Sequence, residues 1–290
     1  MSVLPFDDRD GQIWMDGELI PWREAKLHVL SHGLHYASCV FEGERVYGGT
    51  IFKLREHSQR LIESGKILGY TLPYSVEEID AASNAVVKAN NITDGYVRPV
   101  AWRGSEMMGV AAQATKIRLA IATWPWPSYF SPEARLRGIR LQISEWRRPH
   151  PQTAPTNSKA AGLYMICTLS KHRAEGEGYE DSLMLDWRGQ VAEATGANVF
   201  LAIDGKLHTP TPDCFLDGIT RRTVIGLAKK RGIEVIERAI LPEEMAKASE
   251  VFLTGTAAEV TPVREIGPYQ FQPGRLCEAM IADYDGLVRA

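Results

Sequence analysis

A short aromatic and proline-rich segment divides the sequence into two dissimilar parts. Trp124-Pro125-Trp126-Pro127-Ser128-Tyr129 places two prolines among three large rings. Proline breaks a helix and cannot donate a hydrogen bond within a sheet, so we expect neither a helix nor a central strand here. A chain of 290 residues has room for about two domains. We therefore predict an ordered interdomain connection whose rings line a cleft.

The composition is that of a globular protein with nearly balanced charge. Lys and Arg number 33 against 36 Asp and Glu, and 44% of the residues are apolar. Without a basic excess there is no electrostatic reason to expect a nucleic-acid partner. No apolar run approaches the roughly 18 residues that span a bilayer, so we expect no membrane partner either.

Two further features favour the cytoplasm. The first eight residues become acidic before an apolar signal segment can form. The four cysteines are widely spaced and include no C-x-x-C pair, which predicts buried free thiols and not a disulfide framework or a zinc site. These residues are Cys39, Cys167, Cys214 and Cys277.

The N-terminal part has the pattern of a small α+β domain with an antiparallel sheet. Asp16-Gly17 predicts a hairpin over residues 13–20, and Gly48-Gly49 a second hairpin over 40–52. Leucines spaced by seven predict a helix over 53–68, and a capping box of Ser75 and Glu78 opens another. Strands are expected over 96–102 and 117–123. We place this domain at residues 1–129.

The C-terminal part, residues 138–290, follows a connection at 130–137. Turns at Arg188-Gly189 and Asp204-Gly205 separate short apolar runs. We expect strands over residues 139–146, 182–187, 190–193, 199–203, 234–239 and 250–253. Helices are expected over residues 158–174, 218–231 and 242–247, the second ending at Gly232.

Three histidines form the first candidate site. His28, His32 and His35 would face one metal ion only on a helix, and Ser31 and Gly33 argue against a helix there. We expect structural histidines or histidines at the rim of an active site, with a histidine-based metallohydrolase as an alternative. The sequence contains no dinucleotide, P-loop, zincin or α/β-hydrolase motif.

Several small clusters suggest other chemistry. Gly218-Ile219-Thr220 opens a helix whose free N–H groups would suit a phosphate, and residues 254–258 form a second small, hydroxyl-rich turn. Arg60 could add a bidentate charge to the same phosphate. Lys159 lies among small residues at the start of the helix expected over 158–174, as a Schiff-base nucleophile would. Glu193 ends an apolar strand. Each cluster alone has an ordinary structural explanation.

Taken together, the clusters resemble the class IV aminotransferases, a pyridoxal 5′-phosphate (PLP) family that includes the branched-chain amino acid aminotransferases. Eight segments in the family's order carry the resemblance, which runs from about Trp14 to Val263. They are residues 35–36, 41–45, 55–61, 96–99, 157–162, 193–200, 218–221 and 254–262.

The resemblance implies a two-domain fold of mixed α+β and α/β type. A small N-terminal α+β domain would precede a larger barrel-like domain that binds PLP, with the cofactor between them near a dimer interface. Lys159 would attach the cofactor and move the proton between substrate and cofactor. Glu193 would pair with the pyridine nitrogen, and Tyr164 with the phenolic oxygen. The phosphate would be held by Arg60, Ile219, Thr220 and Thr256.

The resemblance also implies how substrates are recognised. An apolar pocket for a branched side chain would contain Phe41, Tyr164, Trp126 and Ala257, and Arg45 belongs to the same substrate-binding set. Tyr96 and the backbone of residues 256–257 would meet the α-carboxylate. Arg98, with Tyr36 of the partner subunit, would take the distal carboxylate of glutamate and must lie at the rim of the pocket.

The expected activity is transfer of the amino group of leucine, isoleucine or valine to 2-oxoglutarate by a homodimer. One departure bears on substrate range: the loop Met107-Met108-Gly109-Val110-Ala111-Ala112 lacks the Asn-Pro that often follows Met-Gly-Val. In the family this loop reaches the partner's site. A D-amino acid or (R)-amine transaminase, or an aminodeoxychorismate lyase of the same fold, therefore remains an alternative. So does a binding module that kept the fold and lost catalysis.

Overall fold

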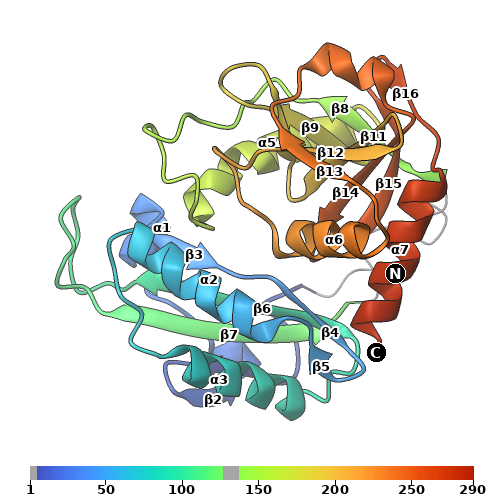
Figure 1. The fold of residues 1–290 in the computed structure, drawn as a ribbon. Helices are drawn as coiled ribbons and strands as arrows, with labels where there is room; N and C mark the ends of the chain where they lie inside the picture. Colours follow the sequence, from blue (N-terminus) through green and yellow to red (C-terminus); the bar gives the residue numbers. More distant parts are fainter. Residues whose placement is uncertain (1–4, 127–136) are drawn as a thin grey trace. The chain divides into compact units, whose positions relative to one another are not determined.

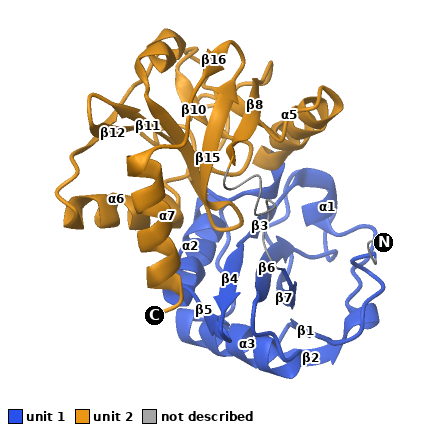
Figure 2. Ribbon diagram, turned by 90° about the vertical axis from the view of Figure 1, so that its right-hand side faces the viewer, with its two compact units in different colours: residues 1–127, 158–162 blue, residues 128–157, 163–290 orange. Residues whose placement is uncertain are grey.

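The computed structural model describes residues 5–126 and 137–290, and the chain forms two compact units. Unit 1 comprises residues 1–127 and 158–162, and unit 2 comprises residues 128–157 and 163–290 (Figure 2). Of the connection expected at 130–137, only Arg137 lies within the described residues. Ser158–Gly162 belongs to unit 1, although the sequence assigned this segment to the C-terminal domain.

Unit 1 is built on an antiparallel seven-stranded sheet (Figure 1). Its order is β2-β1-β7-β6-β4-β5, and β3 also pairs with β6. The strands are β1 (Gln12–Met15), β2 (Glu18–Pro21), β3 (Cys39–Phe41), β4 (Glu44–Tyr47), β5 (Thr50–Ile51), β6 (Gly95–Arg103) and β7 (Ile117–Pro125). The helices are the 3₁₀ turn η1 (Trp22–Glu24), α1 (His32–Tyr36), α2 (Leu54–Ile67) and α3 (Val76–Ala89).

The local predictions for unit 1 hold because turn and cap chemistry is short-range. The first hairpin turns at Asp16 (φ 49°) and Gly17 (φ 109°), the positive φ values that such a turn requires. The Ser75 hydroxyl accepts from the Glu78 N–H, and the Glu78 carboxylate accepts from the Ser75 N–H, so the capping box at α3 is confirmed. Helix α2 and strand β6 are also where the sequence placed them, and β7 begins at the expected residue.

Two predictions for the N-terminal part of this unit, residues 5–126, are wrong. β7 continues through Trp124 and Pro125, which we had excluded from a central strand. The strand tolerates proline because Pro125 is its last residue, opposite Gly95 of β6, whereas β1 pairs with β7 only at Ile121 and Ala120. The second error concerns His32–Tyr36, which form the helical turn α1 in spite of Gly33.

The core of unit 1 lies between the sheet and two helices. α2 and α3 pack against each other and against the strands. Their apolar faces contribute Leu61, Ile79 and Val86, all inaccessible to solvent. They belong to one cluster with sheet residues that include Val40, Val46, Val97, Leu119 and Ile121.

Unit 2 contains a closed barrel of six strands. Its sheet runs β10-β9-β8-β15-β14-β11, and β11 pairs back with β10 to close the ring. These strands are β8 (Ile139–Ile143), β9 (Asp181–Leu185), β10 (Val191–Ala194), β11 (Asn198–Ile203), β14 (Glu250–Gly255) and β15 (Glu259–Ile266). β12 (Lys206–Pro210) and β13 (Val235–Arg238) extend the sheet from β11, and β16 (Tyr269–Gln270) pairs with β15. The expected barrel-like domain is confirmed.

The barrel is filled and covered by apolar side chains. Leu141, Leu183 and Leu253 belong to its interior cluster and are inaccessible to solvent. On the outside, α6 (Ile219–Lys230) and α7 (Arg275–Val288) pack against each other and against β14 (Figure 1). The other helices are the 3₁₀ segments η2 (Ala161–Tyr164) and η3 (Pro242–Lys247), and α5 (Met165–Gly176). No helix among the described residues combines the length and apolar character needed to cross a membrane.

Candidate functional site

Lys159 is held in unit 1 by two neighbouring elements. The Phe41 N–H of β3 donates to the Lys159 carbonyl over 3.2 Å, and the Lys159 N–H donates to Ser64 Oγ of α2 over 3.0 Å. The Ser158 hydroxyl donates to the Ser64 carbonyl. These bonds tie the backbone to β3 and α2, so the expectation that Lys159 begins a helix is wrong; α5 starts only at Met165.

The amine of Lys159 is poised to act as a nucleophile. Its Nζ lies 4.9 Å from the centre of the Phe41 ring. Burial and the Arg60 guanidinium lower the pKa of Lys159 from 10.5 to about 8, against the opposing effect of Glu42. A larger share of the amine is therefore neutral near pH 7, and only the neutral form can attack a carbonyl carbon.

Arg60 approaches this site from α2 and is clamped by a buried carboxylate. Its Nε and Nη2 donate to Glu42 Oε1 and Oε2 over 2.6 and 2.8 Å, and His57 Nδ1 lies 2.7 Å from the same Oε2. Burial raises the pKa of Glu42, but Arg60 and His57 outweigh burial and hold that pKa below its usual value. The carboxylate is thus ionised and accepts from both partners.

An aromatic group with one arginine adjoins Phe41. The Arg98 guanidinium lies 4.8 Å from the Phe41 ring centre and 5.3 Å from that of Tyr96. Its Nη2 is 3.5 Å from the Tyr96 hydroxyl, and the rings of Tyr96 and Trp126 are 5.6 Å apart. The structure therefore brings Phe41, Tyr96, Arg98 and Trp126 together with Lys159.

The other two substrate-binding residues expected in unit 1, Tyr36 and Arg45, have other ring partners. Tyr36 is exposed on α1 and stacks on His32, with ring centres 4.5 Å apart. Arg45 is buried on β4, opposite Tyr96 of β6, with its guanidinium 5.1 Å from the Tyr47 ring centre.

In unit 2, Glu193 is held by two partners that the sequence did not reveal. Arg148 Nε lies 3.4 Å from Glu193 Oε1, and Asn198 Nδ2 donates to Glu193 Oε2 over 3.2 Å. Burial opposes the charge of Arg148, but the Glu193 carboxylate outweighs it and raises the pKa of the guanidinium. A buried glutamate needs a counter-charge, yet nothing in the sequence shows which of 33 basic residues supplies it.

Asn198 also connects Glu193 to the start of α6. Its Nδ2 donates to the Leu216 carbonyl over 3.0 Å, and a Cβ on Gly218 would collide with its Oδ1. Glycine is therefore required where the chain passes Asn198. Gly218 is the N-cap residue, without a side-chain cap, and the first turn of α6 contains no acidic residue. The N–H groups of Ile219 and Thr220 thus begin a helix suited to an anion.

The turn after β14 lies at the same edge of the barrel. Asn198 of β11 pairs with Thr254 of β14, and the half-buried Thr256 and Ala257 follow directly. Tyr164, the last residue of η2, is half-buried and interacts electrostatically with Arg148. Unit 2 therefore gathers Glu193, the start of α6 and Thr256 at one edge.

The three histidines do not converge on a metal site. His32 Nε2 donates to the Gly109 carbonyl, and its Nδ1 accepts from the Ser38 hydroxyl. His28 Nδ1 accepts from a backbone N–H, and His35 Nε2 donates to a backbone carbonyl. Each ring is oriented by a different local partner, so the metallohydrolase hypothesis loses its geometric basis.

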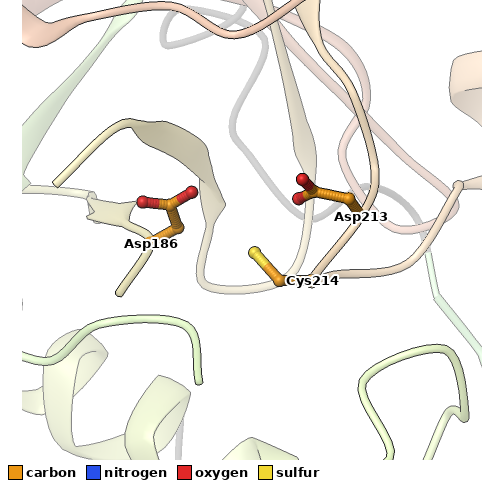
Figure 3. A group of neighbouring side chains, drawn as sticks. All are labelled: Asp186, Asp213 and Cys214. Atoms are coloured by element: carbon orange, nitrogen blue, oxygen red, sulfur yellow. The ribbon is translucent and has the colours of Figure 1, made fainter. Parts of the chain in front are cut away.

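Among the described residues, the side chains close enough to share a metal ion are Asp186, Asp213 and Cys214 (Figure 3). Both carboxylates of this group already form ion pairs with Arg188. Arg188 Nη2 lies 2.6 Å from Asp186 Oδ2 and 2.9 Å from Asp213 Oδ2. The Asp186 Oδ1 also accepts from the N–H of Arg188 in the following turn. We therefore interpret the group as a turn stabilised by an ion pair.

These two groups of residues fit the donors that a PLP enzyme needs. Unit 1 offers a lysine amine of lowered pKa beside an arginine, and unit 2 offers a buried carboxylate beside an uncapped helix N-terminus. The amine suits covalent attachment of an aldehyde, the carboxylate suits a pyridinium nitrogen, and the arginine and helix suit a phosphate.

Known proteins support the same conclusion. The family model described as amino-transferase class IV matches residues 39–266. A branched-chain-amino-acid aminotransferase of Pseudomonas aeruginosa is 43% identical over 272 residues, covering 92% of this chain and 89% of that protein. The solved structure of the Escherichia coli branched-chain amino acid aminotransferase has a TM-score of 0.93 at 39% identity, covering 97% of this chain and 95% of that one.

A further solved structure concerns the cofactor. The branched-chain amino acid aminotransferase of Thermobaculum terrenum in its PLP-bound holo-form has a TM-score of 0.89 at 31% identity, covering 97% of this chain and 95% of that one. The family model spans most of this chain, and the alignments with the relatives named above cover nearly all of this chain. The chain therefore belongs to the class IV aminotransferases, which are PLP-dependent enzymes.

Proposed function

We propose that this enzyme transfers the amino group of L-leucine, L-isoleucine or L-valine to 2-oxoglutarate, by ping-pong kinetics. The relatives and solved structures above are named for branched-chain amino acids. The observation that carries the proposal is the half-buried Lys159, whose amine has a pKa of about 8 and lies against Phe41 beside the Tyr96–Arg98 group.

Lys159 has two roles in this reaction. Its neutral amine would hold the cofactor covalently, and the same amine would carry the proton to and from the substrate Cα. PLP supplies an electron sink that stabilises negative charge at that carbon. A lysine with an ordinary pKa would offer a far smaller neutral fraction at neutral pH.

The remaining cofactor residues would position PLP. Glu193, kept buried beside Arg148, would pair with the pyridine nitrogen, and Tyr164 with the phenolic oxygen. Charge-assisted and backbone hydrogen bonds would hold the phosphate. These come from Arg60, Ile219, Thr220 and Thr256.

Substrate recognition combines apolar surface with one arginine. Phe41, Trp126, Tyr164 and Ala257 would contact the aliphatic side chain, and Tyr96 with the backbone of residues 256–257 would contact the α-carboxylate. Arg98 and Tyr36 of the partner subunit would bind the distal carboxylate of glutamate. The cation–π contacts of Arg98 with Phe41 and Tyr96 support this, because they keep its charge stabilised while an apolar substrate occupies the pocket. We assign Arg45, opposite Tyr96, to the same set.

An amino-donor panel tests the function. Leucine, isoleucine, valine, aromatic amino acids and (R)-amines are compared in both enantiomers as kcat/KM with 2-oxoglutarate. We expect the branched L-amino acids to lead, and Lys159→Ala to lose both the yellow colour of the attached cofactor and transamination. A preference for D-amino acids or (R)-amines, or pyruvate release from aminodeoxychorismate without an acceptor, would replace the proposal with another activity. Full activity in Lys159→Ala would refute the site.

We also propose a homodimer. Large exposed apolar side chains occur on two segments that the His32–Gly109 hydrogen bond joins. They are Leu27, Val29, Leu30, Leu34, Tyr36, Met107, Met108 and Val110, the last 90% exposed. An apolar cavity of about 380 Å³ in unit 1 adjoins them, lined in part by Leu34, Val100 and Trp102. So large an apolar surface favours a protein partner.

Sedimentation measures this directly. Leu34→Asp should dissociate the dimer, whereas Leu241→Asp, at another exposed apolar residue in unit 2, should not. A wild-type monomer would contradict the proposal. We further propose a cytoplasmic location, supported by the four free cysteines; recovery of the protein in a secreted fraction would contradict it.

A further inference from the structure

We propose that Glu42 is a positioning residue for the cofactor: it fixes the Arg60 guanidinium so that the edge turned away from Glu42 meets the phosphate. This inference rests on the proposed role of Arg60. The sequence indicates no role for Glu42, and in the structure its carboxylate accepts hydrogen bonds from Arg60 and His57.

The Arg60 guanidinium and the Glu42 carboxylate form a bidentate pair. Arg60 Nε and Nη2 form one edge of the planar guanidinium, and both donate to Glu42, over 2.6 and 2.8 Å. Two parallel bonds fix both the position and the plane of the group, which a single bond could not. The edge that carries Nη1 then points in a defined direction. The two bonds to Glu42 thus limit the rotamers that this long side chain can adopt.

Glu42 is itself held rigidly. Its side chain is inaccessible to solvent, and His57, 2% exposed, approaches its Oε2 at 2.7 Å. Because an ionised carboxylate only accepts, His57 Nδ1 donates this bond. Glu42 also follows β3 directly, and its N–H donates to the Pro99 carbonyl of β6 over 2.8 Å. Backbone and side chain are thus anchored to the sheet and to α2 respectively.

The structure offers a matched comparison two residues along the chain. Glu44 on β4 is also inaccessible to solvent, but within the described part of the chain neither of its carboxylate oxygens has a hydrogen-bond partner. Burial and the nearby Glu42 and Asp80 carboxylates raise the pKa of Glu44 well above its usual value. Two buried glutamates, one directly after β3 and one on β4, thus differ in role: Glu42 is an ionised acceptor for Arg60, and Glu44 is a neutral acid.

The stability of the fold alone does not explain the buried pair of Glu42 and Arg60. A buried ion pair is often no more stable than apolar side chains of similar size, because both charges lose their hydration. The clearest contribution of a buried ion pair is that it holds its two side chains in one defined arrangement. Here that arrangement lies beside Lys159, whose pKa is lowered by Arg60 and raised by Glu42.

The test compares two ligands with the reconstituted enzyme. Cofactor is removed, and PLP or pyridoxal, which lacks the phosphate, is titrated back into the wild type and into Glu42→Gln, Arg60→Gln, the double variant and Glu44→Gln. The ³¹P chemical shift of bound PLP reports the phosphate environment. We expect Glu42→Gln to weaken PLP binding at least about tenfold, equivalent to about 1.4 kcal/mol, and to move the ³¹P signal. Pyridoxal affinity should change much less, because the effect of Glu42 on the pKa of Lys159 acts on both ligands alike. Both affinities should be unchanged in Glu44→Gln.

The double variant isolates the route of the effect. If Glu42 acts only through Arg60, the double variant should bind PLP no more weakly than Arg60→Gln alone. Glu42→Asp, which retains the charge but withdraws it by one methylene, should fall between wild type and Glu42→Gln, and it replaces Glu42→Gln should that variant fail to fold.

Four results would overturn the inference. Equal losses for PLP and pyridoxal would indicate general disruption. Tighter PLP binding in Glu42→Gln would mean that the negative charge of Glu42 in the wild type only repels the phosphate. Loss in Arg60→Gln with no change in Glu42→Gln would refute the inference and leave the proposed function intact. No change in Arg60→Gln would refute the phosphate role of Arg60 itself.

Discussion

The lowered pKa of Lys159 has a consequence for stability that can be measured without substrate. In the cofactor-free protein the folded state binds this proton less tightly than the unfolded state, because the pKa is about 8 when folded and 10.5 when free. Between these values the unfolded state binds more protons, so stability rises with pH. The destabilisation is fully present below about pH 8 and disappears above 10.5. Replacing Lys159 with Met removes it.

The size of the effect follows from the shift. A difference of 10.5 − 8 = 2.5 pKa units corresponds to about 3 kcal/mol at pH 7. At pH 9.5, where a free lysine amine has already begun to lose its proton, about 1.4 kcal/mol remains. The constant contribution of the new side chain cancels when the two pH values are compared. We therefore expect Lys159→Met to be more stable than wild type, with an advantage about 2 kcal/mol larger at pH 7 than at pH 9.5.

Urea denaturation of the cofactor-free proteins at the two pH values provides the measurement. Lys66→Met is the matched control, since Lys66 is an exposed residue, and such surface changes usually alter stability by less than about 0.5 kcal/mol. An advantage for Lys159→Met that is the same at both pH values would refute the reasoning. It would mean that the amine is solvated in the absence of cofactor and that its nucleophilicity has another origin.

Three further predictions concern other parts of the structure. Gly218→Ala should weaken PLP binding, measured by titration of the cofactor-free enzyme, because the new Cβ collides with Asn198 Oδ1 and moves the start of α6; unchanged affinity would show that the close approach is not required. Arg148→Met should destabilise the protein by about 3–5 kcal/mol in urea, because it leaves Glu193 buried without its counter-charge. Adding Glu193→Gln should recover much of that loss, and no recovery would contradict the pairing. Ser75→Ala should lower stability by about 1 kcal/mol by removing the cap of α3, while Thr71→Ala, outside any cap, should change the thermal midpoint little.

Local chemistry explains which elements could be predicted. The hairpin at Asp16-Gly17 and the Ser75–Glu78 capping box depend on residues within a few positions of one another, so their sequence patterns are sufficient. The strand through Pro125 was misjudged because its tolerance for proline depends on where β1 stops pairing with β7. The helix expected from residue 158 was displaced because the Lys159 backbone bonds to β3 and α2, which are distant in sequence.

The site shows the same division. As residues of the proposed site, Lys159, Glu193, Arg60 and Gly218 could be found from motifs, since each is a characteristic residue type in a characteristic local setting. Arg148, Asn198, His57 and Glu42 act through contacts with those residues, and nothing in their own neighbourhoods indicates which partner they meet.

By itself, the sequence determined the family, the two-part organisation and the groups able to do chemistry, because these depend on residue type and spacing. Only the tertiary structure decided the state of those groups. Burial against Phe41 and the nearby Arg60 lower the pKa of Lys159, and two contacts from Arg60 with one from His57 keep Glu42 ionised. Desolvation and charge pairing are properties of position in space, and position is set by residues far apart along the chain.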